Sequence, residues 1–483
     1  MPHIAVIDLG KTNKKVVLYD ETLRPVADAR TSLPSELVDG VRCEPAAAIW
    51  TWIQAQLAAL HRSHRIDAIA VTTHGATWAG VDAAGALAVP VIAYEHDLGP
   101  GQAELDADYR AVVGDPLAVQ AETGAPDLPL LITTAKGVRF AQRRFPAGWA
   151  RVRHLLNYPQ YWGFRLTGQV AAEPTYQANH TGWFDPRTKA PASTAGKLGI
   201  DRLLPAGLRN PWDVLGTVTG EALAAGVPAV PVVVGIHDSN AALLPYLVKM
   251  GGRDFCLNST GTWCVAMHRV QDTTYRDGEL GQMVLFNLDA FGQPTKVSFL
   301  MGGQEYGLYH DLIGGEDPGT MPAWDPTRIV LPGAFPGQFP GLGGGLGDGP
   351  ARIPLADLKA GRAPAWFRDP VQGHGLLNAS LAYQSEIAIR RTGTGPGTRL
   401  FIEGGFRRNG PYCRLLADRF PGAALTGFAE ATSAGTALLG LAALANTTPM
   451  AFADRITIEE QPITPVADPA EAAYRAAWLA ALA

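Results

Sequence analysis

The chain has 483 residues, of which 47% are hydrophobic and 18% charged, and its formal net charge is −5. This length exceeds what one hydrophobic core usually serves, so we expect two or three domains. The mildly acidic balance offers no general attraction for nucleic acid or for an anionic membrane surface.

The cysteines and the apolar segments indicate a compartment. Four cysteines are scattered along the chain without a CxxC pair, which is typical of reduced cytosolic thiols. The first residues, MPHIAVIDLG, enter a strand pattern at once and lack the basic and apolar regions of a signal peptide. The most apolar stretches, such as AGTALLGLAALA at 434–445, are too short to span a bilayer. We therefore expect a cytoplasmic protein without a membrane partner.

Short β-like runs alternate with Ala- and Leu-rich helical patterns along the chain, which is typical of α/β domains. Residues 4–8 and 15–20 predict a β-hairpin. Residues 44–62 then place apolar side chains at helical spacing, and 66–75 predict a strand. Over 218–245 a short helix, a strand and a second helix are expected.

The pattern restarts past residue 247. Residues 251–268 again predict a strand, a polar Gly/Thr turn and a strand, like the opening hairpin. This weak repeat predicts two halves built alike, with a boundary near 246–252. The Gly- and Pro-rich segment 331–349 predicts a loop.

Four polar clusters each follow a predicted strand at its carboxyl end. In open α/β sheets, ligands bind in the crevice at this edge. Asp, Thr and Gly are also favoured in ordinary turns, so each cluster alone fits simple turn chemistry. Together with a fifth polar turn they favour a binding site. The clusters are 8–12 (DLGKT), 72–75 (TTHG), 235–238 (GIHD) and 403–405 (EGG), and the turn is 259–262 (STGT).

The turns at 8–12 and 259–262 carry residue types that hold a polyphosphate. Glycine lets backbone N–H groups approach phosphate oxygens, Thr12 adds a hydroxyl group, and Asp8 can hold Mg²⁺ directly or through water. A plain hairpin turn explains either segment taken alone.

The remaining polar residues also have two interpretations. His74 and Trp78 fit structural roles as well as sugar binding, and Asp238 fits a helix cap as well as a base. The segment GGFRRNG at 404–410 also has two interpretations. It fits a binding segment in which an arginine lies over the flat ring of a ligand, and it equally fits a glycine-rich turn with solvated arginines. The sequence contains no HExxH, GxSxG or GxGxxG, which argues against zinc hydrolases, α/β-hydrolases and Rossmann dehydrogenases.

The order of these motifs resembles the FGGY family of carbohydrate kinases, members of the actin-like ATPase fold, over nearly the whole chain. DLGKTNKKVVLYD is similar to the family's first phosphate motif, THGATWAGVD to its sugar-binding segment, and LNYPQYWGFRLTG to its LTG signature. GIHDSNAALL is similar to the catalytic-base segment, NSTGTW to the second phosphate motif, GGFRRNG to the adenosine motif and EATSAGTALLGLAAL to the helix after it. The residues of GIHD and STGTW are most similar to the corresponding segments of the rhamnulokinase and fuculokinase branch.

The resemblance implies two actin-like (RNase H-like) α/β domains with an interdomain cleft, residues 1–247 for the sugar and the base and 248–483 for ATP. It implies transfer of the γ-phosphoryl group of ATP, with Mg²⁺, to a hydroxyl of a ketose or deoxyketose such as L-rhamnulose, L-fuculose or xylulose. Asp238 is the implied general base and, with Asp8, a Mg²⁺ ligand. The implied ATP contacts are Gly10, Thr12, Lys15, Ser259, Gly261, Thr262, Gly404, Gly405 and Asn409, and the implied sugar contacts are Thr73, His74, Gly75, Trp78, Asp97 and His237.

Two positions depart from the family pattern. Lys11 stands where a small residue is usual, which changes the contacts near the phosphates. The family's Asp followed closely by Arg becomes YEHDLGPGQ at 94–102, so that either Glu95 or Asp97 takes the sugar-contacting place.

The alternative function is an actin-like ATPase or nucleotide-binding protein without sugar kinase activity. A nucleotide scaffold alone would need neither Asp238 nor the HG and LTG segments, so we favour the kinase. The expected partners are a small sugar and ATP, without nucleic acid, and a homodimer is the candidate assembly.

Overall fold

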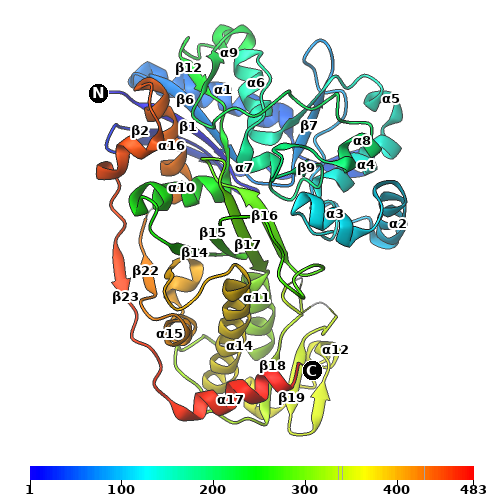
Figure 1. Cartoon of the computed structure of the whole chain (residues 1–483), viewed down its shortest axis with the longest axis vertical. Coiled ribbons are helices and arrows are strands. Elements are labelled where there is room, and N and C mark those ends of the chain that lie inside the picture. Colours follow the sequence, from blue (N-terminus) through cyan, green and yellow to red (C-terminus); the bar gives the residue numbers. More distant parts are fainter. Residues whose placement is uncertain (336, 340, 429, 483) are drawn as a thin grey trace.

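The framework of the protein is a pair of seven-stranded mixed sheets. The computed structural model describes residues 1–335, 337–339, 341–428 and 430–482. The first sheet lies in the upper part of Figure 1 and has the order β11-β12-β6-β1-β2-β3, with β13 also paired to β6. Its strands are β1 (Ile4–Leu9), β2 (Lys14–Tyr19), β3 (Pro25–Thr31), β6 (Ala68–Thr73), β11 (Val214–Thr217), β12 (Pro231–Val233) and β13 (Ile236–His237).

The second sheet comes from the C-terminal half and lies below the first in Figure 1. Its order is β16-β17-β15-β14-β21-β22-β23. Its strands are β14 (Phe255–Thr260), β15 (Cys264–Arg269), β16 (Val284–Leu288), β17 (Pro294–Leu300), β21 (Arg399–Gly404), β22 (Ala424–Thr426) and β23 (Glu460–Pro462). The smaller sheets are β4 (Glu36–Val38) with β5 (Val41–Cys43), β7 (Trp78–Val81) with β8 (His154–Asn157), β9 (Phe184–Asp185) with β10 (Ala190–Pro191), and β18 (Arg328–Leu331), β19 (Gly345–Asp348) and β20 (Ala351–Ile353).

Both large sheets contain a hairpin beside a parallel strand. β1 pairs antiparallel with β2 and parallel with β6, and β14 pairs antiparallel with β15 and parallel with β21. The outer neighbour of each hairpin, β3 or β17, is antiparallel as well. The predicted repeat of the two halves is therefore confirmed.

Helices cover both faces of the first sheet, which explains why β1 is apolar on both sides. Ala5 and Ile7 of β1 pack in a cluster with Ile49 and Ile53 of α1 (Ala46–Ser63), which is the predicted amphipathic helix. The other helical segments of this half are η1 (Gly99–Gly101), α2 (Gln102–Val113), α3 (Pro116–Thr123), α4 (Thr134–Arg144), α5 (Pro146–Trp149), α6 (Tyr158–Thr167), α7 (Pro174–Gln177), α8 (Ser193–Lys197), α9 (Gly220–Ala224) and α10 (Asp238–Met250).

The opposite face of the first sheet is covered by a helix from the far end of the chain. Leu438 and Leu441 of α16 (Ala431–Leu444) join Ile4 and Val6 of β1 in one buried cluster. Figure 1 shows α16 beside β1 and β6, well away from the second sheet. The two halves in sequence are therefore interleaved in space.

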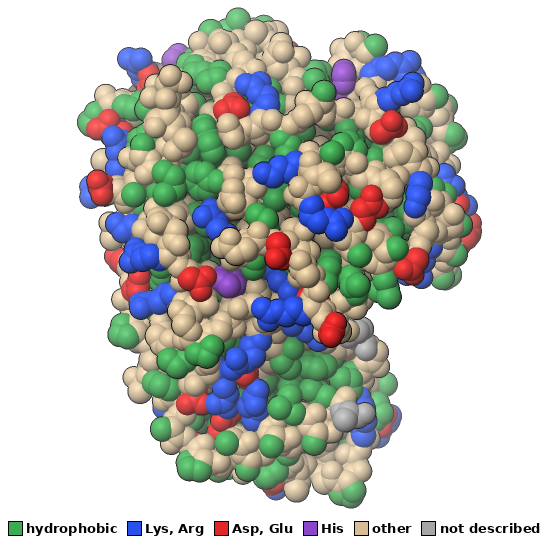
Figure 2. Space-filling model, in the orientation of Figure 1, with side chains coloured by type: hydrophobic (Ala, Val, Ile, Leu, Met, Phe, Trp, Pro, Cys, Tyr) green, Lys and Arg blue, Asp and Glu red, His purple; other side chains and the backbone are tan. Residues whose placement is uncertain are grey.

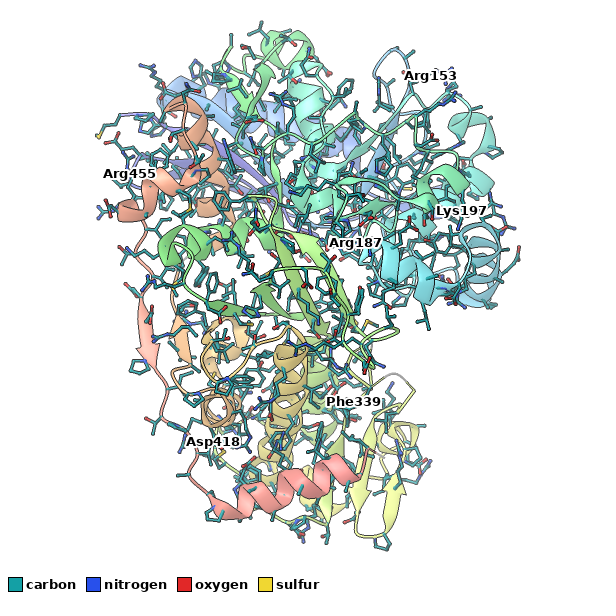
Figure 3. The ribbon with its side chains drawn as sticks, in the orientation of Figure 1. Arg153, Arg187, Lys197, Phe339, Asp418 and Arg455 are labelled. Carbon is teal, nitrogen blue, oxygen red and sulfur yellow. The ribbon has the colours of Figure 1, made fainter. Side chains whose placement is uncertain are left out.

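Helix α16 is held there by two further contacts. It crosses α10 so closely that a side chain at Gly435 would overlap the carbonyl oxygen of Ala241. Beyond it, Arg455 at the end of η3 (Pro449–Arg455) donates a hydrogen bond of 2.6 Å to the carbonyl oxygen of Glu21 (Figure 3).

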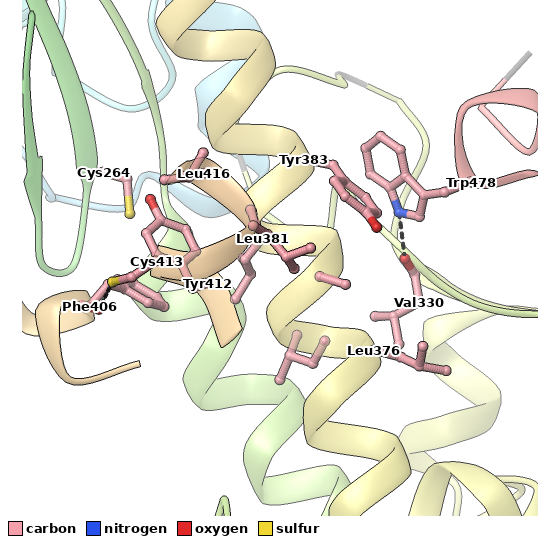
Figure 4. Close-up of a cluster of buried hydrophobic side chains, with 14 of the residues drawn as sticks. Cys264, Val330, Leu376, Leu381, Tyr383, Phe406, Tyr412, Cys413, Leu416 and Trp478 are labelled. Atoms are coloured by element: carbon pink, nitrogen blue, oxygen red, sulfur yellow. Dashed lines mark hydrogen bonds between the residues drawn. The ribbon is translucent and has the colours of Figure 1, made fainter. Parts of the chain in front are cut away.

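A second core lies around α14 (Pro370–Arg391) in the C-terminal half. Trp478, fully buried, donates from Nε1 to the carbonyl oxygen of Val330 at 3.1 Å, and Leu376 and Tyr383 of α14 belong to the same cluster (Figure 4). The helical segments of this half are α11 (Gly302–Ile313), α12 (Leu355–Lys359), α13 (Ala365–Arg368), η2 (Gly405–Arg408), α15 (Gly410–Arg419) and α17 (Pro469–Ala480), besides those already given.

The segment 331–349 is only partly the predicted loop. Residues 336 and 340 lie outside the described residues, and 345–348 form β19, because they pair with the neighbouring β18 and β20. Figure 2 shows basic and acidic side chains interspersed over the visible face. Within the described ranges no single helix has the length and apolarity to cross a membrane, and one pair, α16 with η3, passes that test only as a broken span bent by 118°.

Candidate functional site

Parallel strand ends in the first sheet deliver the predicted catalytic residues to one edge. β1 and β13 both run parallel to β6, and Asp8 of β1 and Ile236 of β13 both lie opposite Thr72. Asp8 and the pair His237 and Asp238 therefore emerge close together where the strands end. This is the edge at which α/β sheets bind ligands.

Asp238 is the first residue of α10 and lies in the wall of a cavity. Its Oδ1 accepts a hydrogen bond from the Ser239 amide at 2.6 Å and lies 3.4 Å from Nε2 of His237. The helix cap is His237, without a side-chain bond, so the capping interpretation of Asp238 is not supported. Burial raises the pKa of Asp238 to about 6. A carboxylate with this pKa is a better proton acceptor near neutral pH than an ordinary one.

The cavity beside Asp238 lies between the two halves of the chain and has a volume of about 210 Å³. Its walls differ in character, because the first half supplies most of the polar side chains and the second sheet supplies apolar ones. From the first half come His74, Gly75, Ala76, Tyr94, Leu128, Ile132, Asn179, His180, His237, Asp238 and Ser239, and from the second Trp263, Val265, Met267, Leu285, Asn287, Val297 and Phe299.

Three histidines surround Gly75 in this cavity. A Cβ atom at Gly75 would lie 2.6 Å from Nε2 of His237 and 2.8 Å from Nε2 of His180, so the site requires glycine here. Asn179 donates from Nδ2 to Nε2 of His237 at 3.0 Å. Burial lowers the pKa of His74, of His180 and of His237 to about 3, so all three rings are neutral near pH 7.

Asp8 is a buried carboxylate held by side chains from both ends of the chain. Its Oδ2 accepts a hydrogen bond from Ser433 of α16 at 2.5 Å and lies 3.6 Å from Nζ of Lys15. Lys15 also lies 2.6 Å from Glu430. Burial raises the pKa of Asp8, Lys15 lowers it, and the charge of Asp238 raises it further. The two carboxylates are therefore close enough to repel each other.

Asp8 and Asp238 fit a Mg²⁺ site that substrate phosphates would complete. In the part of the chain that the structure describes, no group of three or more His, Cys, Asp or Glu side chains could hold an ion alone. Mg²⁺ often takes only one or two carboxylates and fills its shell with water and phosphate oxygens. A cation between Asp8 and Asp238 would also offset their repulsion.

Lys11 joins the β1–β2 turn to the segment of Glu95. Its ammonium group pairs with the buried Glu44, lies 2.6 Å from Glu95, and stands 5.3 Å from the centre of the Tyr94 ring. Tyr94 lines the cavity, whereas Glu95 does not, so Glu95 is next in the chain to a lining residue.

The other site residues predicted in the first half lie at different distances from the cavity. Gly10 and Thr12 lie in the turn after β1, where Thr12 is exposed. Thr73 is buried at the end of β6. The structure does not bring Trp78 or Asp97 to the cavity: Trp78 is 2% exposed and packs in the core, and Asp97 is exposed and accepts a hydrogen bond from the backbone of its own turn.

The second half repeats the arrangement of strand end and turn. Ser259 lies opposite Glu403 and Thr260 opposite Gly404 along the parallel pair β14 and β21. Gly404 has φ = 85°, and a Cβ atom there would overlap the carbonyl oxygen of Thr260. Thr260 in turn donates from Oγ1 to the carbonyl oxygen of Glu403 at 2.5 Å. These contacts hold the ends of β14 and β21 together.

A second cavity, of about 580 Å³, begins at this turn. Asn409 caps α15 by accepting from the Tyr412 amide at 3.1 Å, and its Nδ2 donates to Asn378 at 2.7 Å. The cavity brings together the predicted Gly261, Thr262, Gly405 and Asn409 and adds Gly303, Gln304, Tyr306, Asp317, Gly319, Phe406 and Arg408. Backbone N–H groups, aromatic rings and polar side chains suit a nucleotide.

Sequence reasoning missed residues of both cavities. Gly303 and Gln304 follow β17 as MGGQE, a glycine pair at a strand end, so this signal was readable. Asn179 and His180 lie in an irregular segment that offered no periodic signal.

Comparison with protein families gives two matches, one in each half of the chain. Residues 3–245 match the N-terminal domain of the FGGY family of carbohydrate kinases, and residues 249–323 match the C-terminal domain of carbohydrate kinase FGGY. The curated proteins contain no match.

Solved structures similar to this chain match over nearly its whole length. A carbohydrate kinase from Novosphingobium aromaticivorans is 26% identical, with a TM-score of 0.79 over 99% of this chain and 98% of that one. A xylulose kinase from Rhodospirillum rubrum is 19% identical with the same TM-score and coverage. Plasmodium falciparum glycerol kinase with ADP is 15% identical, with a TM-score of 0.75 over 100% and 98%. The predicted two-domain, actin-like α/β fold is confirmed.

Proposed function

Because the chain belongs to the FGGY family of carbohydrate kinases, we propose that it transfers the γ-phosphoryl group of ATP to a hydroxyl of a ketose or deoxyketose, such as xylulose, L-rhamnulose or L-fuculose. The observation that carries this is the place of Asp238, with its raised pKa, in the wall of a cavity of sugar size. The similarity to a xylulose kinase supports a ketose as the acceptor. The similarity of the segments GIHD and STGTW to the rhamnulokinase and fuculokinase branch supports a deoxyketose.

Asp238 serves as the general base in this proposal. The attacking hydroxyl donates a hydrogen bond to the carboxylate, its oxygen bonds to the γ-phosphorus, and the proton passes to Asp238 as the bond to ADP breaks. Phosphoryl transfer depends on positioning and charge neutralisation more than on covalent chemistry, so a carboxylate base suffices. Mg²⁺, when bound at Asp8 and Asp238, supplies charge neutralisation for the phosphates.

The two glycine turns hold the phosphates from opposite sides. In this proposal residues 1–247 contribute Gly10, Thr12 and Lys15 together with the sugar site, and residues 248–483 contribute the remaining ATP contacts. Backbone N–H groups of such turns bind anions. The apolar wall of the sugar cavity helps to exclude water, which would otherwise compete for the phosphoryl group.

A coupled assay of ADP formation tests the proposal. We expect ADP formation from ATP and Mg²⁺ that depends on a sugar from a panel of ketoses, deoxyketoses and polyols. Asp238→Asn keeps the shape of the side chain and should lower kcat by roughly 10²- to 10⁴-fold. Asp201→Asn makes the same charge change at an exposed position and should leave kcat unchanged.

ADP formation that no sugar stimulates would instead support the ATPase alternative, and an Asp238→Asn variant with full activity would exclude Asp238 as the base.

We further propose a cytoplasmic location, which is supported by the four cysteines, all buried free thiols. Assembly as a homodimer stays a prediction.

A further inference from the structure

The cavity beside Asp238 has two chemically different walls, and we propose that these walls select an uncharged sugar and exclude sugar acids. The sugar presents hydroxyl groups to His74 and His180 and an apolar end to the strands β15, β16 and β17. This inference rests on the proposed kinase function and deepens it by naming the groups that choose the acceptor.

The hydrogen-bonding pattern of two histidines is fixed by the backbone. Nδ1 of His74 lies 3.0 Å from the carbonyl oxygen of Gly75, and Nδ1 of His180 lies 3.1 Å from that of Ile132. A carbonyl oxygen can only accept, so Nδ1 carries the hydrogen in both rings and Nε2 carries a lone pair. Both Nε2 atoms are therefore hydrogen-bond acceptors, to which a hydroxyl group can donate.

Both histidines line the cavity. Nε2 of His74 is buried and has no hydrogen-bond partner within the described residues. Nε2 of His180 lies against Gly75, where a Cβ atom would be only 2.8 Å from it. A buried acceptor without a partner is unfavourable, so a hydroxyl group at this position gains the full benefit of its hydrogen bond.

The polar wall also lacks a positive charge. Neither Lys nor Arg occurs among the described residues that line the cavity, and its histidines are neutral near pH 7. Lys11, whose charge reaches His74, is already paired with Glu44 and Glu95. The carboxylate of a sugar acid at this wall would meet the lone pairs of the two histidines without a lysine or arginine to pair with.

The opposite wall is one apolar face of the second sheet. Met267 of β15 and Leu285 of β16 both lie opposite Val297 of β17, and Val265 lies opposite Phe299. All five side chains line the cavity, and Asn287 at the edge of this face is the polar exception. Away from Asn287, whose buried Oδ1 has no hydrogen-bond partner among the described residues, a hydroxyl group against this face would lose its water without gaining a partner, whereas a methyl group would gain contact.

The test compares three acceptors that differ at one end only: a deoxyketose with a terminal methyl group, the parent ketose with a hydroxymethyl group, and the matching sugar acid. We expect kcat/KM for the deoxyketose to exceed that for the parent by about 10- to 100-fold, and the acid to show no turnover. Val297→Thr, which replaces a methyl by a hydroxyl at equal volume, should reduce that ratio. Val26→Thr makes the same change at an exposed position and should leave it unchanged.

Variants of His180 test the polar wall. His180→Phe keeps a ring but removes the acceptor, so the KM for the sugar should rise at least tenfold while the KM for ATP stays the same. His180→Gln restores an acceptor oxygen and should recover part of the loss, and thermal unfolding checks that both variants fold. An unchanged sugar KM in His180→Phe would overturn the role of His180.

The outcomes separate this inference from the function on which it rests. Efficient turnover of the sugar acid, or a preference for the hydroxymethyl end, would overturn the inference and leave the kinase standing. ADP formation that no acceptor stimulates would overturn the kinase itself.

Discussion

Replacing Asp238 by Asn should remove the general base and, at the same time, raise the free energy of unfolding. The carboxylate is held at the cleft between two halves, and burial raises its pKa from 3.8 to about 6, which means that folding disfavours its charged form. Asn is uncharged and nearly the same shape. Its Oδ1 can still accept the hydrogen bond that Ser239 now donates.

The size of the effect follows from the pKa shift. At 1.36 kcal/mol per pH unit, the shift corresponds to roughly 3 kcal/mol against the charged carboxylate. The side chain keeps 31% exposure, and screening by solvent reduces this figure, so we expect Asp238→Asn to raise the free energy of unfolding by about 1–2 kcal/mol near pH 8.

The sign of the pH dependence is fixed by the direction of the shift. Above pH 6 the folded wild type carries the costly charge, and the advantage of Asp238→Asn is complete. As the pH falls through 6 the folded carboxyl takes up a proton, and below about 4 it is neutral in both folded and unfolded chains, so the difference disappears. Thermal unfolding of both proteins from about pH 5 to about pH 8 measures this difference.

A variant that is less stable than the wild type near pH 8, or a difference that does not shrink as the pH falls, would refute the reasoning. Asp201→Asn, at an exposed position, is the matched control and should show no such pH-dependent gain.

Two further predictions concern catalysis and the ATP side of the cleft. In the wild type, kcat/KM for the sugar should fall about tenfold per pH unit below about pH 6, because protonated Asp238 cannot accept the hydroxyl proton; a flat profile down to about pH 4 would contradict this. Gly404→Ala, at φ = 85° and against the carbonyl oxygen of Thr260, should cost roughly 1–3 kcal/mol of stability and weaken ATP binding. Titration with ADP measures the binding, and Gly422→Ala, at φ = 84° in open space, should lower stability but leave ADP binding unchanged.

The sequence alone was sufficient to predict the site residues that lie at the ends of strands. Asp8, His74 and Asp238 follow apolar runs, and because those strands are parallel, their ends meet at one edge. The hairpin repeat was readable for the same reason, since β1–β2 and β14–β15 are local in sequence.

The parts that could not be predicted depend on contacts distant in sequence. His180 reaches the cavity from an irregular segment, and only the space left by Gly75 makes that approach possible. Trp78 belongs to the HG segment, yet the strand alternation turns it into the core. Asp97 and Glu95 are two residues apart, and only Glu95 pairs with Lys11, a contact between segments that are distant in sequence.

The position of α16 also bears on when the site can form during synthesis. Asp8 is made among the first residues, but the hydroxyl that contacts it, that of Ser433, comes from a helix translated more than four hundred residues later. Until that helix leaves the ribosome, Ile4 and Val6 on one face of the first sheet lack the leucines of α16 that pack in their cluster. Although nascent domains generally fold from the N-terminus, a chain of this fold must finish its earliest sheet last.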